Sequence, residues 1–486
     1  MRSGRLGSRV FASAHDAPVM DTPDGSSTCV VGNGYVGTVV AACLASLGRT
    51  VIGLETDAVR LRTLRSGRVP FHEPGLERLL SAALRGGRLT FTDDPHLAAA
   101  DSGVVFLCVG SPSRDDGSAD LRPIEAAGRS LGRWARPGQV FVVKTTAPVG
   151  TSQWLASLVA EAGDLGSAAN VRVVSNPEFL RQGSAIEDFL HPPRIVLGGY
   201  DDRAIDAVVD IYRPVLDQRF PGGDESHRPV LIRTTPTVAE AAKYASNAFL
   251  AAKVSFVNEI SNICDRIGVD VTEVARVMGL DPRIGAEFLK AGLGWGGSCF
   301  AKDLDALILT AREAGHRPEL LQAVREVNER QRDVVVAKLC EHLALAGAHI
   351  TLFGLAFKPG TDDLRGATSV LLARRLMSRG ARVTTYDPVV RSIPGLPQVT
   401  VAADPYEAAE EADAVVLVTD WPELRRLDFG ALRARMRGHL LVDGRNAFDP
   451  HAAAQAGFLY EGMGRGNGAE RARTSATAEA FVRQAP

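Results

Sequence analysis

Residues 27–57 read "STCVVGNGYVGTVVAACLASLGRTVIGLETD", and this stretch decides the fold class. A short apolar run leads into a glycine cluster, a segment rich in small residues follows, and a second apolar run ends at Glu55. Strand, glycine turn, helix and strand in this order are typical of two parallel strands joined by a crossover helix. The small residues suit a helix that lies close on a sheet. The stretch therefore predicts a doubly wound α/β domain.

The same stretch predicts a dinucleotide site. Three glycines spaced G-x-G-x-x-G allow a tight turn and a close approach of the backbone to a pyrophosphate, which the helix N-terminus then stabilises. Glu55 ends the second strand, where a carboxylate can hold ribose hydroxyls and repel the extra phosphate of NADP, so NAD is favoured. The alternative, a tight turn without a ligand, is the weaker interpretation because strand, helix and acid all accompany the glycines. The predicted cofactor contacts here are Gly32, Gly34, Tyr35, Val36, Gly37 and Glu55.

The rest of the chain predicts two Rossmann-like parallel-sheet domains joined by a helical segment. Further strands are expected up to residues 193–199, which we take as the last strand of the first domain, and a polar loop at 219–229 marks the junction. Strand–helix alternation returns after residue 345, and residues 403–420 repeat the pattern of residues 93–110. The predicted boundaries are a disordered extension at 1–27, an NAD-binding domain at 28–220, the helical segment at 230–330, the second Rossmann-like domain at 331–465 and a mobile tail at 466–486.

Composition excludes several classes of function. With 486 residues, the chain is long enough for about three domains. The net charge of −2 gives no electrostatic reason to expect nucleic acid or an anionic membrane as a partner. No apolar run reaches the roughly 18 residues of a spanning helix, and the N-terminus lacks the apolar core of a secretion signal. The six cysteines show no zinc-ligand spacing, so we expect no metal and a reducing, cytoplasmic location.

The stretch "GWGGSC" (294–299) places a cysteine after a glycine loop. The residues that follow look helical, so Cys299 is expected at or near a helix N-terminus, where the dipole stabilises a thiolate. Asp303 would then lie on the same helical face, with Lys302 beside it. This arrangement suits covalent catalysis through sulfur. A buried, inert cysteine is the alternative, and the surrounding glycines and charges make it the less favoured one.

Three other groups of polar residues are candidate functional positions. Glu178 follows Asn-Pro at a strand end, and Lys243 and Asn247 are spaced i, i+4 on a predicted helix, where they could donate to a developing oxyanion. Lys358 and Arg365 follow a strand of the second domain and suit a phosphate-bearing ligand. Each group could equally be a solvated or capping feature, and periodicity alone does not bring any of them near Cys299.

Taken together, the motifs resemble the UDP-glucose and GDP-mannose dehydrogenase family. The resemblance runs from about Thr28 to about Pro450 and rests on "GNGYVG", "EPGLERLL", "TTAPVGT", "SNPEFL", "KYASNAFLAAKVSFVNEI", "DPRIGAEFLKAGLGWGGSCFAKD", "FGLAFKPGTDDLR" and "DGRNAFD". Within the family, the motifs are most similar to the UDP-glucose branch. The resemblance implies an NAD-dependent four-electron oxidation of a nucleotide sugar to its uronate, which feeds polysaccharide or nucleotide-sugar synthesis. It also implies a homodimer or higher homo-oligomer built through the helical segment.

The resemblance further implies roles for individual residues. Cys299 matches the nucleophile that carries a thiohemiacetal and then a thioester. Lys243, Asn247 and Asp303 match residues that handle the alcohol proton, stabilise the oxyanion and order the water. Glu178 and Thr146 match positions lining the same site, with Glu178 as acid or base. The implied cofactor contacts also include Ser111, Pro112, Thr146 and Arg365. The implied substrate contacts are Glu178, Phe179, Leu180, Lys243, Asn247, Arg283, Phe288, Leu289, Gly292, Gly296, Phe300, Lys358 and Arg445, of which Arg283 reaches a neighbouring subunit's site in some members.

Some residues depart from the family pattern, and other functions stay open. Gln182 replaces a glutamate, which removes a charge near the substrate, and Ala301 replaces a proline. The same chemistry on GDP-mannose or a UDP-N-acetylhexosamine is one alternative, and a single oxidation without a role for Cys299 is another. A non-catalytic NAD-binding or scaffold protein is a third, and the intact set of Lys243, Asn247, Cys299 and Asp303 argues against it.

Overall fold

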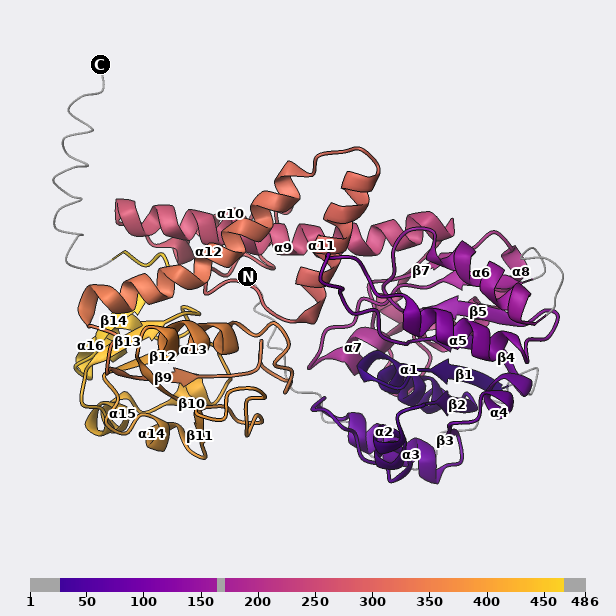
Figure 1. Ribbon diagram of the computed structural model, residues 1–486, viewed down its shortest axis with the longest axis horizontal. Coiled ribbons are helices and arrows are strands. Elements are labelled where there is room, and N and C mark those ends of the chain that lie inside the picture. The colour runs from indigo at the N-terminus through magenta and orange to yellow at the C-terminus, as the bar shows by residue number, and fades with distance from the viewer. Residues whose placement is uncertain (1–26, 164–170, 467–486) are drawn as a thin grey trace, which may run out of the picture. The chain divides into compact units, whose positions relative to one another are not determined.

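The computed structural model describes residues 27–163 and 171–466 (Figure 1). Apart from Ser27 and Gly466, the extension expected at 1–27 and the tail expected at 466–486 lie outside the described residues. The described chain forms two compact units. The first comprises residues 27–112, 119–163 and 171–243, and the second comprises residues 113–118 and 244–466.

The first unit contains an eight-stranded sheet in the order β3-β2-β1-β4-β5-β6-β7-β8. Strands β3 to β6 of this order are parallel, as predicted, but β7 pairs antiparallel with β6, and β8 then pairs parallel with β7. The prediction that residues 193–199 form the last strand is wrong, because β8 follows the polar loop and extends the sheet. The strands are β1 (Ser27–Val31), β2 (Val51–Leu54), β3 (Leu89–Thr92), β4 (Ser102–Leu107), β5 (Val140–Val143), β6 (Arg172–Ser175), β7 (Arg194–Gly198) and β8 (Val230–Thr234).

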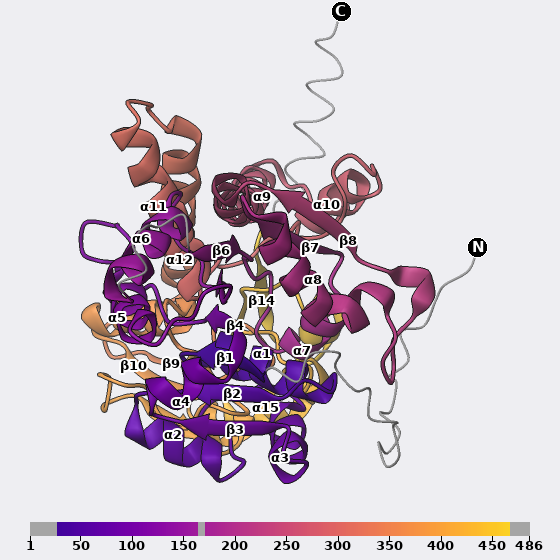
Figure 2. The ribbon, with the colours of Figure 1, turned by 90° about the vertical axis from the view of Figure 1, so that its right-hand side faces the viewer.

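Alternating strand residues bury two separate hydrophobic cores, one on each face of this sheet. In β1, Val30 packs into one core while Cys29 and Val31 pack into the other, because successive side chains point to opposite faces. Figure 2 shows α5 and α6 on one side of the sheet and α7 and α8 on the other. The helices are α1 (Tyr35–Ser46), α2 (Ala58–Arg65), α3 (Leu76–Arg85), α4 (Pro95–Ala100), α5 (Arg122–Gly132), α6 (Thr151–Ala162), α7 (Ala185–Leu190) and α8 (Asp202–Asp217), with a 3-10 turn at Glu225–His227.

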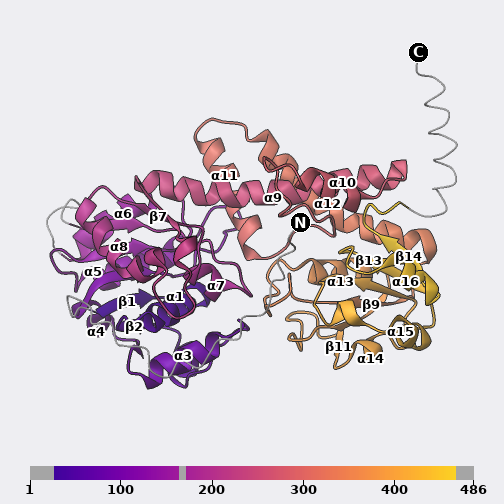
Figure 3. The ribbon, with the colours of Figure 1, turned by 180° about the vertical axis from the view of Figure 1, so that it is seen from behind.

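The second unit contains a six-stranded parallel sheet in the order β11-β10-β9-β12-β13-β14. The chain therefore contains the two predicted doubly wound sheets, and helices lie on both faces of this one as well (Figure 3). Its strands are β9 (His349–Phe353), β10 (Arg382–Tyr386), β11 (Thr400–Ala402), β12 (Ala414–Leu417), β13 (Leu440–Asp443) and β14 (Leu459–Gly462). The helices are α10 (Val271–Gly279), α11 (Ser298–Glu313), α12 (Glu319–His342), α13 (Thr368–Ser378), α14 (Pro405–Ala408), α15 (Phe429–Arg435) and α16 (Pro450–Gln455), with a 3-10 turn at Leu424–Arg426.

A long helix, α9 (Pro236–Ile267), belongs to both units. Its residues up to Lys243 are part of the first unit, and its residues from Tyr244 are part of the second. None of the helices within residues 27–163 and 171–466 is both long enough and apolar enough to cross a bilayer.

The internal echo in the sequence has a structural counterpart. Residues 93–110 form α4 and β4, and residues 403–420 form α14 and β12. Each short helix begins with an Asp-Pro pair whose aspartate, Asp94 or Asp404, accepts backbone N–H groups of the first turn. Each strand then pairs with the first strand of its sheet, on the side where the strand order reverses.

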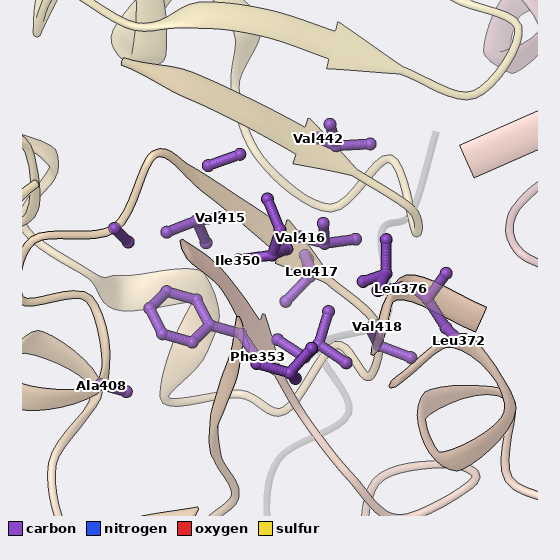
Figure 4. Close-up of a cluster of buried hydrophobic side chains, with 14 of the residues drawn as sticks. Ile350, Phe353, Leu372, Leu376, Ala408, Val415, Val416, Leu417, Val418 and Val442 are labelled. Carbon is purple, nitrogen blue, oxygen red and sulfur yellow. The ribbon is translucent and has the colours of Figure 1, made fainter. Parts of the chain in front are cut away.

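The core of the second sheet is built from branched and aromatic side chains that are fully buried. Ile350 and Phe353 of β9, Val416 of β12 and Leu372 and Leu376 of α13 lie together in it (Figure 4). Each of these five side chains is 0% exposed. Such a core transfers apolar surface from water at a gain of roughly 25 cal/mol per Å².

We expect the Phe353→Ala substitution to lower the free energy of unfolding by about 3–5 kcal/mol, because it removes a buried ring and leaves a cavity. Urea denaturation of the purified protein measures this change. Leu320→Ala on the surface of α12, where the leucine is 71% exposed, is the control and is expected to shift the value by about 0.5 kcal/mol or less. Equal effects of the two substitutions would contradict the buried position of Phe353.

Candidate active site

The three glycines of the motif, Gly32 and Gly34 in the turn after β1 and Gly37 in the first turn of α1, differ in what surrounds them. Gly32 has a φ of 81°, which favours glycine, and a Cβ at Gly37 would lie 2.1 Å from the carbonyl oxygen of Gly32. A Cβ at Gly34 would meet no atom within 4 Å. Gly34 also precedes the first turn of α1 and has no side chain to cap it. The turn thus leaves open space and uncapped N–H groups at one point, which fits the pyrophosphate of a dinucleotide.

Glu55 lies against this turn, at the end of β2. Its carboxylate is 3% exposed and accepts the backbone N–H of Asn33 at 2.9 Å. Arg60 makes an ion pair with the same carboxylate at 3.2 Å. The structure therefore brings the predicted acid to the predicted turn, while its contact with a ribose stays a prediction.

The other predicted groups of the first unit follow the carboxyl ends of β4, β5 and β6. Ser111, beside the exposed Pro112, donates to the carbonyl oxygen of Thr146 at 2.6 Å. Lys144 and Asn176 were not among the predicted residues, but Lys144 is buried at the same edge and its Nζ atom donates to Asn176 Oδ1 at 3.0 Å. Burial lowers the pKa of Lys144 to about 8. In an open α/β sheet, ligands bind at this edge, which supports a site here.

Glu178 and Lys243 form a nearly buried charged pair in the first unit. The Lys243 Nζ atom lies 3.4 Å from the Glu178 carboxylate, and both side chains are nearly buried, at 6% and 11% exposed. Phe179 lies between two cations, 5.0 Å from Lys243 Nζ and 4.0 Å from the guanidinium of Arg194. Leu180 donates its N–H to the Glu178 carboxylate at 2.6 Å. A buried lysine–carboxylate pair of this kind can exchange a proton with a bound alcohol.

Cys299 is the second residue of α11, as the sequence predicts for a residue near a helix N-terminus. It is exposed, whereas Cys29, Cys43, Cys108 and Cys264 are buried. Burial raises the pKa of the Cys108 thiol to about 12, which keeps that thiol protonated and inert. Among the described cysteines, Cys299 thus combines exposure with a helix N-terminus, the setting of a reactive thiol.

Asp303 lies one helical turn beyond Cys299 and is 1% exposed. Its carboxylate accepts the amide N–H of Asn247 at 2.5 Å and the ammonium of Lys302 at 2.7 Å. Asn247 lies on α9, one turn after Lys243. The i, i+4 spacing read from the sequence is therefore real, and Asn247 is joined to the cysteine helix through Asp303.

Two glycines fix the loop that leads to Cys299. A Cβ at Gly296 would lie 2.7 Å from the carbonyl oxygen of Gly366, and a Cβ at Gly297 would lie 2.8 Å from the Phe357 ring. Gly297 also has a φ of 88°. The loop therefore packs by its backbone against the segment that follows β9, and side chains at these positions would push the two apart.

Buried side-chain amides on α9 and α12 hold the same loop, and none of them was predicted from the sequence. Asn328 of α12 accepts the N–H of Trp295 at 2.7 Å and donates to its carbonyl oxygen at 3.0 Å. Gln331 donates to the carbonyl oxygen of Gly292, and Asn258 of α9 accepts the N–H of Gly292. Asn328 and Gln331 lie on the buried face of α12, together with Val324, Val327 and Val335. Polar residues at helical spacing within an apolar face could have identified them from the sequence.

Arg365 and Lys358 lie in the segment that touches the cysteine loop. Arg365 makes a two-pronged contact with Asp363, at 2.9 Å and 2.6 Å. This hydrogen-bonded pair raises the pKa of Arg365, and the Cys299 sulfur nearby raises it further. Lys358 Nζ lies 5.8 Å from the centroid of the Phe357 ring. Arg365 therefore belongs to the surroundings of Cys299, and Lys358 lies beside Phe357 in the segment that the cysteine loop touches.

Arg445 follows β13 and lines a separate cavity of about 400 Å³. Its Nε atom donates to the carbonyl oxygen of Val418 at 2.6 Å, and burial lowers the pKa of the guanidinium. Leu289 and Lys290 line the same cavity from the predicted substrate loop. The cavity offers cations and apolar surface together, which suits a nucleotide.

The remaining predicted substrate contacts lie in the same unit. Phe288 has a φ of 65°, a strained conformation for a bulky residue, and its ring lies 6.3 Å from that of Phe300. Backbone strain of this kind gathers at ligand sites. Arg283 is paired with Asp281, and its side chain is 88% exposed. The structure thus places Arg283 on the surface, apart from the contacts just described.

The described geometry defines a class of protein. One unit carries a dinucleotide turn with an acid beside it, and the other carries an exposed thiol at a helix N-terminus with a buried amide–carboxylate pair. This combination is that of a dinucleotide-dependent dehydrogenase with a candidate nucleophile.

Comparison with known proteins leads to the same class of enzyme. Three family models match: "UDP-glucose/GDP-mannose dehydrogenase family, NAD binding domain" at residues 26–216, its central domain at 237–330 and its UDP binding domain at 351–450. UDP-glucose 6-dehydrogenases of Pseudomonas aeruginosa and Rhizobium meliloti are each 43% identical, over 90% of this chain and 97% and 99% of their own length. A solved UDP-glucose dehydrogenase of Pyrobaculum islandicum is 40% identical and covers 92% of this chain and 99% of its own, with a TM-score of 0.82.

The chain belongs to the UDP-glucose/GDP-mannose dehydrogenase family. It is an NAD-binding dehydrogenase, so the cofactor predicted from the glycine turn and Glu55 is confirmed at the level of the family. The individual site residues stay predictions, and the structure adds their positions.

The two glycine positions allow a matched test of the cofactor turn. We expect Gly37→Ala to destabilise the first unit, because the new methyl group collides with the Gly32 carbonyl oxygen. We expect Gly34→Ala to leave the melting temperature nearly unchanged and to weaken NAD binding by about tenfold or more, since its methyl group enters the space of the pyrophosphate. Thermal melting and equilibrium titration with NAD measure the two effects. Unchanged NAD affinity in Gly34→Ala would contradict the assignment of the turn.

Proposed function

We propose that the chain oxidises UDP-glucose to UDP-glucuronate in two NAD-dependent steps through a covalent intermediate on Cys299. The observation that carries the proposal is the exposed thiol in the first turn of α11, with the buried Asp303 one turn further along the helix. The names of the relatives and the match to a UDP binding domain support the choice of substrate.

The proposed reaction consists of two oxidations at C6 and a final hydrolysis. NAD, when bound, accepts one hydride from the C6 carbon in each oxidation. Loss of the hydroxyl proton and a hydride turns the C6 alcohol into an aldehyde, and the Cys299 sulfur adds to its carbonyl carbon to give a thiohemiacetal. Loss of a second hydride and a proton gives a thioester, and water then breaks the carbon–sulfur bond to release the carboxylate and the thiol. One sugar, two NAD and one water thus give one uronate, two NADH and three protons.

The polar side chains supply the proton transfers and the charge stabilisation. Lys243 and Glu178, paired at 3.4 Å, are together suited to handle the alcohol proton, since the ammonium can donate to the C6 oxygen and the carboxylate can accept a proton. Asn247, held by Asp303 at 2.5 Å, is suited to donate to the oxyanion of the tetrahedral species. Glu178 or Asp303 activates the water for hydrolysis of the thioester. The thiol is needed because a free aldehyde would otherwise escape between the two oxidations.

We propose that a second copy of the chain covers the surface of α9. Phe249, Phe256 and Ile263 recur every seven residues on this helix and are 67%, 51% and 45% exposed. A hollow of about 920 Å³ lies beside Ile263, between α9 and α12. A row of large apolar side chains of this kind is typical of a protein–protein contact. A homo-oligomer formed through this surface would agree with the resemblance noted in the sequence.

We expect Cys299→Ser to reduce the release of uronate by about a thousandfold or more, because an alkoxide replaces the thiolate as nucleophile and leaving group. The binding of NAD should be unchanged. Chromatography of the products and NAD titration provide the two readouts. Cys340→Ser, at the other exposed cysteine, is the matched control and should retain activity. Uronate release by Cys299→Ser at the wild-type rate would refute the covalent mechanism.

We expect Phe256→Asp to shift the protein toward a smaller assembly, because a charge replaces an apolar contact. Light scattering during size-exclusion chromatography measures the mass. Tyr200→Asp, at a position 66% exposed in the first unit, serves as the control and should leave the mass unchanged. The same mass for Phe256→Asp and the wild type would argue against this surface.

A further inference from the structure

Glu73 is a buried carboxylate that joins two segments of the first unit. It lies between α2 and α3 and is 7% exposed. It accepts the hydroxyl of Tyr35 and the backbone N–H groups of Gly183, at 2.5 Å, and Ala185, at 2.8 Å. A carboxylate can accept all three hydrogen bonds because it has no donor of its own, whereas a glutamine would present an N–H group to at least one of the donors.

One end of this connection is the cofactor turn. Tyr35 is the first residue of α1 and directly follows Gly34, the position with open space for a pyrophosphate. The Phe71 ring packs against the Tyr35 ring with 4.9 Å between the centroids. Burial and the hydrogen bond to Glu73 raise the pKa of Tyr35, so the hydroxyl keeps the proton that it donates.

The other end is the loop of residues 176–184, which contains Glu178. Helix α7 begins at Ala185, and the side chain of its N-cap residue, Ser184, makes no capping hydrogen bond. Glu73 supplies the missing acceptor from a distant part of the chain. It therefore fixes the exit of the loop.

The entry of the loop is fixed separately. Asn176 accepts hydrogen bonds from Lys144 Nζ at 3.0 Å and from the Tyr212 hydroxyl at 2.8 Å. It also donates its amide N–H to the carbonyl oxygen of Val196. Since both ends are held by buried polar groups, a shift at either end moves the loop that positions Glu178 against Lys243.

We propose that Glu73 is a positioning residue that couples NAD binding at the start of α1 to the placement of the Glu178 loop. NAD that fixes the first turn of α1 also restrains Tyr35, and through Glu73 it restrains residues 183–185. The loop is thus ordered around Glu178 before the acid–base steps begin. The inference rests on the proposed function, since that is where Glu178 acquires its role.

Amide hydrogen exchange of the loop, with and without NAD, tests the coupling. In the wild type, NAD should slow exchange in peptides covering residues 179–186. Glu73→Gln should raise exchange there without NAD and abolish most of the slowing by NAD. Tyr35→Phe should keep the slow exchange at Gly183 and Ala185 without NAD, because Glu73 still accepts both, yet lose the slowing by NAD. This difference separates the coupling from simple capping of α7.

Asp94→Asn is the matched control, because Asp94 caps α4 in the same unit through His96 N at 2.8 Å and belongs to a different segment from the loop. It should behave as the wild type. We also expect Glu73→Gln to lower kcat by about tenfold, as a misplaced acid–base group would.

The proposal is overturned if NAD slows exchange of the loop equally in the wild type and in Tyr35→Phe and Glu73→Gln, or if NAD has no effect on the loop in the wild type. Should Glu73→Gln fail to fold, Tyr35→Phe decides alone. The exchange experiment uses NAD without a sugar, so its failure is distinguishable from failure of the proposed function, which would appear as no NADH formed from UDP-glucose by the wild type.

Discussion

The close backbone packing of Gly296 and Gly297 against Gly366 fixes the position of Cys299, the candidate nucleophile. At Gly296 the loop approaches the carbonyl oxygen of Gly366 so closely that a Cβ would lie 2.7 Å from it. The first turn of α11, with Cys299 in it, starts directly after this contact. A cysteine fixed by main-chain packing and by buried amides of α9 and α12 cannot move without disturbing several elements of its unit. Such pre-organisation is what covalent catalysis requires of a nucleophile.

The two units carry different candidate groups. The first gathers the cofactor turn and the Glu178–Lys243 pair at the carboxyl edge of its sheet, and the second gathers Cys299, Asn247 and Asp303 around the start of α11. Helix α9 belongs to both and carries Lys243 and Asn247 one turn apart.

Much of this was predictable from the sequence, and the exceptions have physical causes. The glycine turn, Glu55 and the position of Cys299 depend on local spacing, which the sequence displays directly. Strand β8 was not predicted because it is a short edge strand whose Val230 is 62% exposed. It therefore lacks the continuous apolar pattern of a buried strand. Glu73 and Asn328 act on segments far away in the sequence, and no local pattern reveals a partner at that distance.

The amount of NADH formed per UDP-glucose consumed, with the reaction taken to completion by the wild-type enzyme, decides whether Cys299 carries an intermediate. We expect two NADH and one uronate, because the thiohemiacetal on Cys299 is oxidised a second time before release. One NADH per sugar, with an aldehyde as the product, would contradict the role of Cys299. No NADH from UDP-glucose, but two from GDP-mannose, would contradict the proposed substrate and leave the double oxidation in place.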